Sequence, residues 1–362
     1  MNENKSYFAF SLIKDLGPKN FQKINTYFSS IKQAWDASHS ELAKAGLADK
    51  IISEIIETRN KINLDQELEK IFKQNINIVT LNDNNYPKLL KQISNPPFLL
   101  YYRGKLKDER DKNSIAVVGT RKISNYGKLI TDKFVNNLVN NNLTIISGLA
   151  LGVDAVAHQT CLNNNGRTIA VLGSGLDYDA FYPKDNWRLA EKIIENNGLI
   201  LSEYPPATKA QRHFFPLRNR IVAGLSLGTL VVEAPIKSGA LLTAKIALDQ
   251  NREVFAVPGA INTQNSTGPH DLIKQGAKLV DNIDDILNEL NLRRTEELKI
   301  KNTTPSNPQE EIILNYLLNT PASIDELIQN TKLDSSTINS TLTIMEISGK
   351  IKSLNGVIYI KI

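Results

Sequence analysis

The residues of this chain best suited to chemistry follow short apolar runs, and most of them are small or basic. Glycine lets backbone amides approach an anion closely, and a nearby basic side chain adds positive charge. Several such stretches at one edge of a fold indicate phosphate binding. They are Gly119, Thr120 and Arg121; Ser147 and Gly148; Gly173, Ser174 and Gly175; Lys237, Ser238 and Gly239; and Pro258 and Gly259.

A second group of candidates lies in and near an acid-free window, since no Asp or Glu stands between Tyr204 and Val232. A basic segment with aromatic neighbours is typical of a surface that holds a polyanion. A basic loop with solvated charges is the alternative interpretation. The candidates for phosphate or base contacts here are Lys184, Lys209, Arg212, His213, Phe214, Arg218, Asn219 and Arg220.

The elements that must position these residues alternate between strand and helix from Ser114 to about Leu290. Short apolar runs joined by helical patterns are typical of an α/β fold whose parallel sheet is buried on both faces. Because the crossovers are right-handed, all strand carboxyl ends meet at one edge, where ligands bind. The expected strands are 115–118, 143–146, 168–172, 199–201, 230–232, 254–257 and 277–280.

Two further regions are expected to flank this core, which we place at residues 75–290. Residues 1–72 show helical spacing and a Gly17-Pro18 turn, which indicates a small domain of the SAM or helix-hairpin-helix kind. A packing or partner-binding role suits it better than a grip on DNA. Residues 293–308 are predicted to be a linker.

A winged-helix domain is predicted for residues 309–362. Three helical stretches, 309–319, 323–331 and 335–348, precede a hairpin with a turn at Asn355 and Gly356. The third helix would be the recognition helix, yet it contains no Lys or Arg. Phosphate contacts need cations, so we expect a protein-contact or spacer role and no reading of duplex DNA.

The composition sets limits on the class of protein. A length of 362 residues predicts two or three domains, and the net charge of +5 is compatible with nucleic acid without being diagnostic. The single cysteine, Cys161, excludes an intrachain disulfide and is expected to be packed in the core. No metal site is indicated, and no apolar stretch is long enough to cross a membrane. A cytoplasmic protein is expected.

Taken together, the motifs resemble the DNA-processing protein A family, also called Smf, over about residues 75–285. The threonine at 120 stands where the family often has serine, and it keeps the hydroxyl group. The flanking domains also resemble those of longer members. The matching motifs are 119–121, 147–154, 173–177 with Tyr182 and Pro183, 202–206, 215–220, Glu233 and Ala234, 238–244 and 255–259.

The resemblance implies a Rossmann-like core that binds single-stranded DNA without sequence preference. It implies that the protein protects incoming DNA, displaces single-strand-binding protein and loads the RecA recombinase during natural transformation. It further implies a homodimer through the core, no catalytic activity and no cofactor.

The alternative function is that of a Rossmann enzyme acting on a nucleotide or dinucleotide. Gly173-Ser174-Gly175 begins a dinucleotide fingerprint, but Tyr178 stands where the third glycine belongs. Asp154 and His158 are spaced as an acid–base pair on one helix face, although helix capping by Asp154 is the simpler interpretation. A duplex-DNA regulator acting through the winged helix is the third class.

Arg218 and Arg220, in the acid-free window, are expected to have different roles. Leu217 and Ile221 are predicted to anchor one helical face to the core, which leaves Arg218 and Arg220 off that face. One arginine would reach phosphate while the other pairs with Glu203 or Glu233. These two carboxylates could instead be general bases. Arg121 is expected to point over the sheet edge, and His213 or Phe214 to stack on a base.

Overall fold

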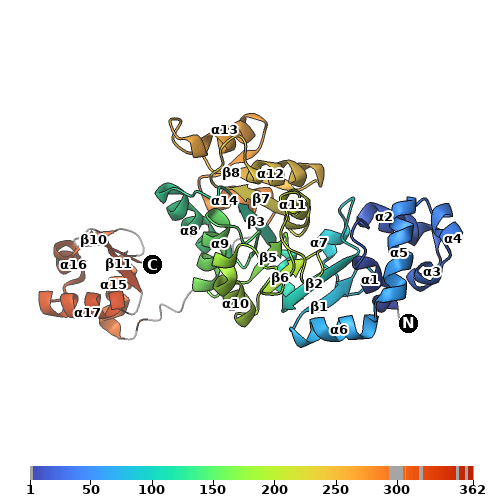
Figure 1. Cartoon of the computed structure of the whole chain (residues 1–362). Helices are drawn as coiled ribbons and strands as arrows, with labels where there is room; N and C mark the ends of the chain where they lie inside the picture. The colour runs from blue at the N-terminus through green and yellow to red at the C-terminus, as the bar shows by residue number, and fades with distance from the viewer. Residues whose placement is uncertain are drawn as a thin grey trace. The chain divides into compact units, whose positions relative to one another are not determined.

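The apolar runs form a nine-stranded sheet within the residues described in the computed structural model of this chain (Figure 1). The strands are β1 (Asn77–Thr80), β2 (Leu99–Gly104), β3 (Ser114–Val118), β4 (Thr144–Ser147), β5 (Thr168–Leu172), β6 (Leu199–Ser202), β7 (Gly228–Val231), β8 (Glu253–Ala256) and β9 (Lys278–Leu279). Their order in space is β1-β2-β6-β5-β4-β3-β7-β8-β9. The α/β class expected from the sequence is confirmed.

The structure describes residues 3–106, 108–292, 305, 307–317, 321–347, 350–354 and 358–361. Two compact units make up the chain, 1–294 and 295–362. The helical N-terminal region and the sheet therefore lie in the same unit. Most of the predicted linker, and the predicted hairpin turn at Asn355 and Gly356, lie outside the described residues. The finer domain boundaries stay a prediction.

The sheet reverses its strand order beside its central strand. Strands β3 to β9 pair in parallel, and β2 pairs antiparallel with both β1 and β6. From β3 the chain builds outward through β4, β5 and β6, then returns to place β7 on the other side of β3. Such a switch point leaves a crevice at the carboxyl ends of the strands. Here that crevice lies between the loops after β3 and β7.

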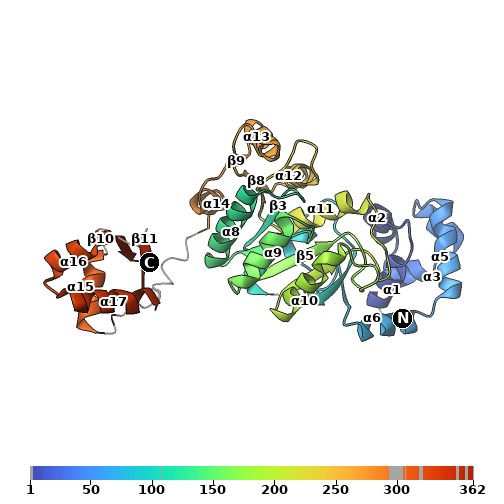
Figure 2. The same ribbon diagram turned by 60° about the vertical axis from the view of Figure 1, so that its left-hand side comes forward.

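Helices cover both faces of the sheet (Figures 1 and 2). Alternate residues of a strand point to opposite faces, so Ile115 and Val117 pack with one helical layer while Ala116 and Val118 pack with the other. The first layer holds α8 (Asn125–Asn140), α9 (Val153–Asn163) and α14 (Ile283–Glu289); the second holds α11 (Phe214–Gly224) and α12 (Gly239–Asp249).

No helix within the described residues is long and apolar enough to cross a membrane.

Shorter segments complete the first unit around these layers. The remaining helices of the sheet region are α7 (Lys88–Lys91), α10 (Trp187–Glu195), α13 (Thr267–Lys274) and the 3-10 turns η1 (Glu109–Lys112), η2 (Lys184–Asn186) and η3 (Gln264–Ser266).

The N-terminal helices share a core with the β2 side of the sheet. Phe21 stacks on Phe98 with ring centroids 3.9 Å apart, and the hydroxyl of Ser11 lies 2.6 Å from that of Tyr101. These contacts fit a packing role for the region. The helices are α1 (Glu3–Ser11), α2 (Pro18–Tyr27), α3 (Ile31–Asp36), α4 (His39–Lys44), α5 (Asp49–Lys61) and α6 (Leu64–Lys73).

The C-terminal unit is a winged helix, as expected. Its antiparallel sheet has the order β10-β12-β11, and its core contains Ile313, Leu327, Ile338 and Met345. The elements are α15 (Pro308–Leu317), β10 (Ala322–Ser323), α16 (Ile324–Thr331), α17 (Ser335–Ile347), β11 (Ile351–Leu354) and β12 (Ile358–Lys361).

Candidate nucleic-acid interface

A groove of about 290 Å³ opens at the switch point between β3 and β7. It joins loops that lie far apart in the sequence, because parallel strands bring their carboxyl ends to one edge. Most of the residues expected from the sequence to bind phosphate line it. Those residues are Gly119, Thr120, Arg121, Gly148, Arg218, Asn219, Lys237, Ser238 and Gly239.

The loop after β3 is held tightly between its neighbours. The Thr120 amide donates to the Glu233 carbonyl over 2.6 Å, and the Val153 amide donates to the Thr120 carbonyl over 3.2 Å. A Cβ at Gly119 would lie less than 3.0 Å from the Val153 side chain, so only glycine fits there. The tight packing fixes the position from which Arg121 leaves the core.

The loop after β4 uses its own amides internally. The buried carboxylate of Asp154 accepts from the amides of Gly148 (3.1 Å) and Ala150 (3.3 Å). Burial raises the pKa of Asp154, whereas nearby Arg218 opposes that rise. Asp154 therefore holds the loop that precedes α9 and does not cap the helix as expected, and these two amides are not free for an anion.

Arg218 lies beneath the groove and is only 6% exposed. Its Nη1 donates to the carbonyls of Gly148, over 2.7 Å, and of Val171. Burial lowers the pKa of Arg218 to about 10, and Asp154 partly offsets this effect. The buried charge is thus stabilised by carbonyl oxygens at the ends of two strands and by a nearby carboxylate.

The expected orientation of α11 is wrong. Leu217 was expected to anchor the helix, yet it is 51% exposed, while Arg218, Ile221 and Val222 face inward. Positions 218, 221 and 222 share one helical face, so burying the guanidinium against the strand ends turns Leu217 outward. Hydrogen bonding of Arg218 thus overrides the apolar pattern.

Arg220 has the acidic partner that the sequence suggested. Its Nη2 lies 2.5 Å from both oxygens of Glu203, and its Nη1 donates to the Asn95 carbonyl over 2.7 Å. Burial raises the pKa of the Glu203 carboxyl, and Arg220 counteracts it. Both arginines of α11 therefore already have oxygen acceptors, and Glu203 orients Arg220.

Glu233 was expected to orient an arginine, and this expectation is wrong. Its carboxylate instead accepts from the amide of Ser124 (3.0 Å), from the Ser124 hydroxyl (2.5 Å) and from the Asn265 amide (3.4 Å). The acid thereby fixes the start of α8. The sequence did not reveal this contact at the start of α8, because Ser124 and Glu233 are 109 residues apart in the chain.

His158 and Cys161 are both buried away from the groove. His158 Nδ1 lies 2.7 Å from the Thr168 hydroxyl, and burial lowers the pKa of His158 to about 3. The Cys161 thiol donates to the Arg167 carbonyl over 3.3 Å, and burial raises its pKa to about 12. Neither group faces the groove, so Asp154 and His158 do not form an accessible acid–base pair.

The exposed cations near this edge include Arg121, Lys122, Lys184, Lys209, Arg212 and Lys237. The Arg121 guanidinium lies over the Phe215 ring, 5.3 Å from its centroid. Among the described residues, no hydrogen bond or ion pair occupies Arg121 or Lys237. Lys184 donates to the Tyr178 carbonyl and lies 3.8 Å from the centroid of the Tyr178 ring.

An aromatic pair stands beside the groove. Tyr182 is 45% exposed, and its ring centroid lies 5.7 Å from that of Phe215. Both rings line a small cleft with Arg121, Gly148 and Gly173. Sequence reasoning named Phe214 instead, which stacks on Tyr204 with centroids 4.0 Å apart. Asn219 lies four residues after Phe215, on the same helical face, and this spacing could have indicated Phe215.

Three other candidate residues pack within the protein and do not line the groove. The buried hydroxyls of Ser147 and Ser174 donate to the carbonyls of Val117 (2.6 Å) and Gly175 (3.1 Å), respectively. Gly175 packs closely against Asp177 and Pro205, and an added Cβ would lie 3.0 Å from an oxygen atom of each. These residues shape the loops from within.

The chain was compared with known proteins. The family described as DNA recombination-mediator protein A matches residues 77–291, which span the sheet and the groove. This chain belongs to that family. The DprA winged helix domain matches residues 301–357. The family assignment agrees with the resemblance seen in the motifs.

Individual relatives show how far the likeness extends. Protein Smf of Synechocystis is 44% identical over 77% of this chain and 70% of its own length. The crystal structure of DNA processing protein A from Streptococcus pneumoniae is 36% identical, with a TM-score of 0.67 over 78% of this chain and 95% of that one.

A Helicobacter pylori relative is also similar over part of the chain. Its DNA processing protein A is 31% identical, with a TM-score of 0.52 over 59% of this chain and 95% of that one. That structure is described for the single-stranded DNA binding mode of the protein.

Proposed function

We propose that this chain is a non-catalytic protein that binds single-stranded DNA along the carboxyl edge of its sheet. The observation that carries the proposal is Arg121, an exposed cation in a groove at the switch point, stacked on Phe215. No acidic partner within the described residues neutralises it. A polyanion supplies the missing charge, and phosphate oxygens accept both ends of the guanidinium fork.

Phosphates would bind where the loop after β7 meets the start of α12. Lys237 is exposed there, and the Ser238 hydroxyl accepts from the Ala240 amide over 3.2 Å. The helix directs its positive end at the groove beside Arg121. Lys184 and Lys209 follow β5 and β6, so they extend the positive charge along one side of the groove. We assign no direct phosphate contact to Arg218 or Arg220, whose guanidinium groups are engaged.

Bases would stack on the aromatic pair, Tyr182 and Phe215. Stacking tolerates any base, because every base presents a flat π face, so it gives affinity without sequence preference. A double helix hides those faces. The arrangement therefore favours single-stranded over double-stranded DNA.

The cellular role that we propose is protection of incoming DNA and its transfer to the RecA recombinase, with displacement of single-strand-binding protein. The family description as a recombination mediator supports this role. A homodimer through the core is part of the proposal. It is supported by large apolar side chains left exposed on the β8 side, among them Ile261 at 92% and Leu279 at 42%.

Anisotropy titrations with labelled oligothymidine test the proposal. Single strands should bind more tightly than duplexes of equal length, and affinity should fall with salt at a slope of about 0.7 per phosphate contact. Equal affinity for duplex DNA would favour a regulator acting through the winged helix. Turnover of a nucleotide or nicotinamide substrate in an absorbance assay would favour the enzyme alternative.

A further inference from the structure

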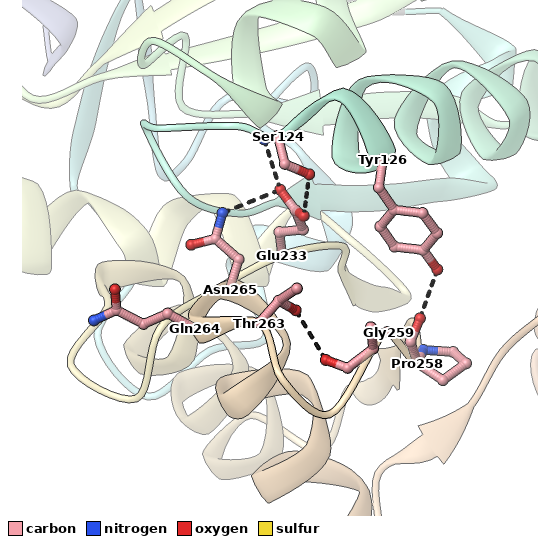
Figure 3. Close-up of a pocket in the computed structure, with 9 residues that line it drawn as sticks. Ser124, Tyr126, Glu233, Pro258, Gly259, Thr263, Gln264 and Asn265 are labelled. Atoms are coloured by element: carbon pink, nitrogen blue, oxygen red, sulfur yellow. Dashed lines mark hydrogen bonds between the residues drawn. The ribbon is translucent and has the colours of Figure 1, made fainter.

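A second cavity, of about 720 Å³, lies on the other side of Glu233 from the phosphate groove. Its walls come from the start of α8 and from the segment after β8 (Figure 3). Pro258 and Gly259, which follow β8 and were expected at the phosphate-binding edge, line this cavity, whereas none of the candidate residues after β3 or β7 does. The residues that do are Ser124, Tyr126, Glu233, Pro258, Gly259, Ala260, Thr263, Gln264 and Asn265.

The chemistry of this cavity differs from that of the groove. Its lining contains no Lys or Arg, and its one carboxylate, Glu233, is held by Ser124 and Asn265. A phosphate would find no cation there. The lining combines a tyrosine ring with uncharged amides and carbonyls, which suits a flat, polar-edged, uncharged ligand.

Tyr126 provides the flat wall. Its hydroxyl donates to the Pro258 carbonyl over 2.6 Å, which fixes the ring across the segment after β8 (Figure 3). The side chain remains 43% exposed. A ring held in place and open on one face can stack on a ligand with little loss of side-chain entropy.

Gln264 provides a polar group that suits any base edge. Figure 3 shows its side chain and the Tyr126 ring on opposite sides of Glu233. No hydrogen bond to another described residue engages the Gln264 amide, and the residue is exposed. An amide group both donates and accepts, so it matches every nucleobase.

The cavity is next to the proposed DNA path, although it shares no lining residue with the groove. The Glu233 carbonyl accepts from Thr120 in the phosphate groove, while the Glu233 side chain lines the cavity. Arg121 and Tyr126 are five residues apart, which limits the separation of their Cα atoms to about 18 Å of extended chain. A strand with a phosphate on Arg121 can therefore place a nearby base against Tyr126.

We propose that this cavity is a nucleobase subsite for the bound single strand, stacking one base on Tyr126. The inference rests on the proposed binding of single-stranded DNA. It adds a contact made only with a base, beside the phosphate contacts of the groove.

The test compares oligothymidine with an abasic oligonucleotide of the same length, using the full chain at one salt concentration. Tyr126→Ala should weaken binding of oligothymidine about fivefold or more, because a stacked base is lost, and leave binding of the abasic strand unchanged. Tyr126→Phe keeps the ring and should stay within about twofold of the wild type. Arg121→Ala should weaken binding of both strands.

Several results would overturn the subsite. Tyr126→Ala could lose affinity equally for both strands, or for neither. Light scattering could also show a changed molecular mass, so that an altered oligomeric state accounts for the lost affinity. Free deoxynucleoside that occupies the cavity as tightly as the strand would make it a site for small molecules instead. If Tyr126→Ala melts early, Gln264→Ala serves as the second variant. It should weaken binding of oligothymidine by less than Tyr126→Ala and leave binding of the abasic strand unchanged. An affinity for oligothymidine equal to that of the wild type would contradict the subsite.

Failure of the subsite and failure of the proposed function are distinguishable. A wild-type chain that binds neither strand removes the proposed function itself. A wild-type chain that binds both strands, with Tyr126→Ala indistinguishable from it, removes only the subsite.

Discussion

The guanidinium of Arg218 occupies the space beside Gly148 and donates to the Gly148 carbonyl over 2.7 Å. A Cβ added at Gly148 would lie less than 3.0 Å from three guanidinium atoms. The glycine is therefore required by the buried arginine and not by the approach of an anion, because its amide already donates to Asp154. Loop and helix act as one packed unit at the floor of the groove.

Gly148→Ala should destabilise the protein by about 1–3 kcal/mol, since the arginine cannot move without losing its carbonyl acceptors. Thermal and urea unfolding measure the change. Gly239→Ala is the matched control, because nothing lies within 4 Å of its added Cβ. Its free energy of unfolding should stay within about 0.5 kcal/mol of the wild type. Equal effects of the two substitutions would contradict the packing argument.

Arg121→Ala should lower the affinity for single-stranded DNA tenfold or more and leave the melting temperature unchanged. The side chain is exposed and contacts phosphate only when DNA is bound, so the salt slope should also fall by about 0.7. Lys209→Ala should have a smaller effect, because this lysine does not line the groove. Anisotropy titrations at several salt concentrations measure both variants.

Two outcomes would count against the role of Arg121. A variant that binds like the wild type would mean that the groove is not the DNA site. A variant that melts early would mean that the stacking of Arg121 on Phe215 is structural.

The sheet could be predicted because its strands are apolar throughout. The runs at 115–118 and 168–172 become β3 and β5 within one residue of their expected ends. Glycines and cations after the strands likewise indicated the edge that we propose binds DNA, since parallel strands leave no other place for their carboxyl ends. These features depend on local composition, which a sequence displays directly.

The orientation of α11 and the partner of Glu233 could not be predicted. Apolar residues occur on more than one side of that helix, so periodicity did not reveal that Leu217 faces outward and Arg218 inward. Glu233 meets Ser124 only because β3 and β7 are neighbours. Such choices depend on hydrogen-bond acceptors supplied by distant segments.

His158 should make stability depend on pH. Its pKa is about 3 in the folded chain, against 6.5 for an ordinary histidine, so between these values the unfolded chain binds the extra proton. The contribution of His158 to stability is therefore present above pH 6.5 and is lost as the pH falls toward 3. His158→Gln removes this titration.

The destabilisation caused by His158→Gln should consequently shrink between pH 7 and pH 5. Urea unfolding of wild type and variant at both values measures the difference. Comparing the two proteins cancels the opposite contributions of the buried acids Asp154 and Glu203, whose pKa values are raised. A difference that stays constant would contradict the buried, neutral imidazole.

Glu203→Gln should destabilise the protein by about 3 kcal/mol, because it leaves the mostly buried Arg220 without its carboxylate partner. Glu57→Gln is the control. It breaks the exposed pair of Glu57, whose side chain is 63% exposed, with Lys61, whose side chain is 69% exposed, and should leave stability almost unchanged. Urea unfolding at pH 7 measures both. A similar effect of the two substitutions would show that Arg220 finds other acceptors.

Deleting residues 309–362 should leave the affinity for single-stranded DNA within a few-fold of the full chain. The deleted segment belongs to a separate compact unit with its own core, so the sheet and its groove keep their contacts. Its third helix, α17, carries no Lys or Arg and hence no charge for phosphate. Anisotropy titrations of both forms decide the matter. A loss approaching a hundredfold would mean that the winged helix itself binds DNA, through surfaces other than α17.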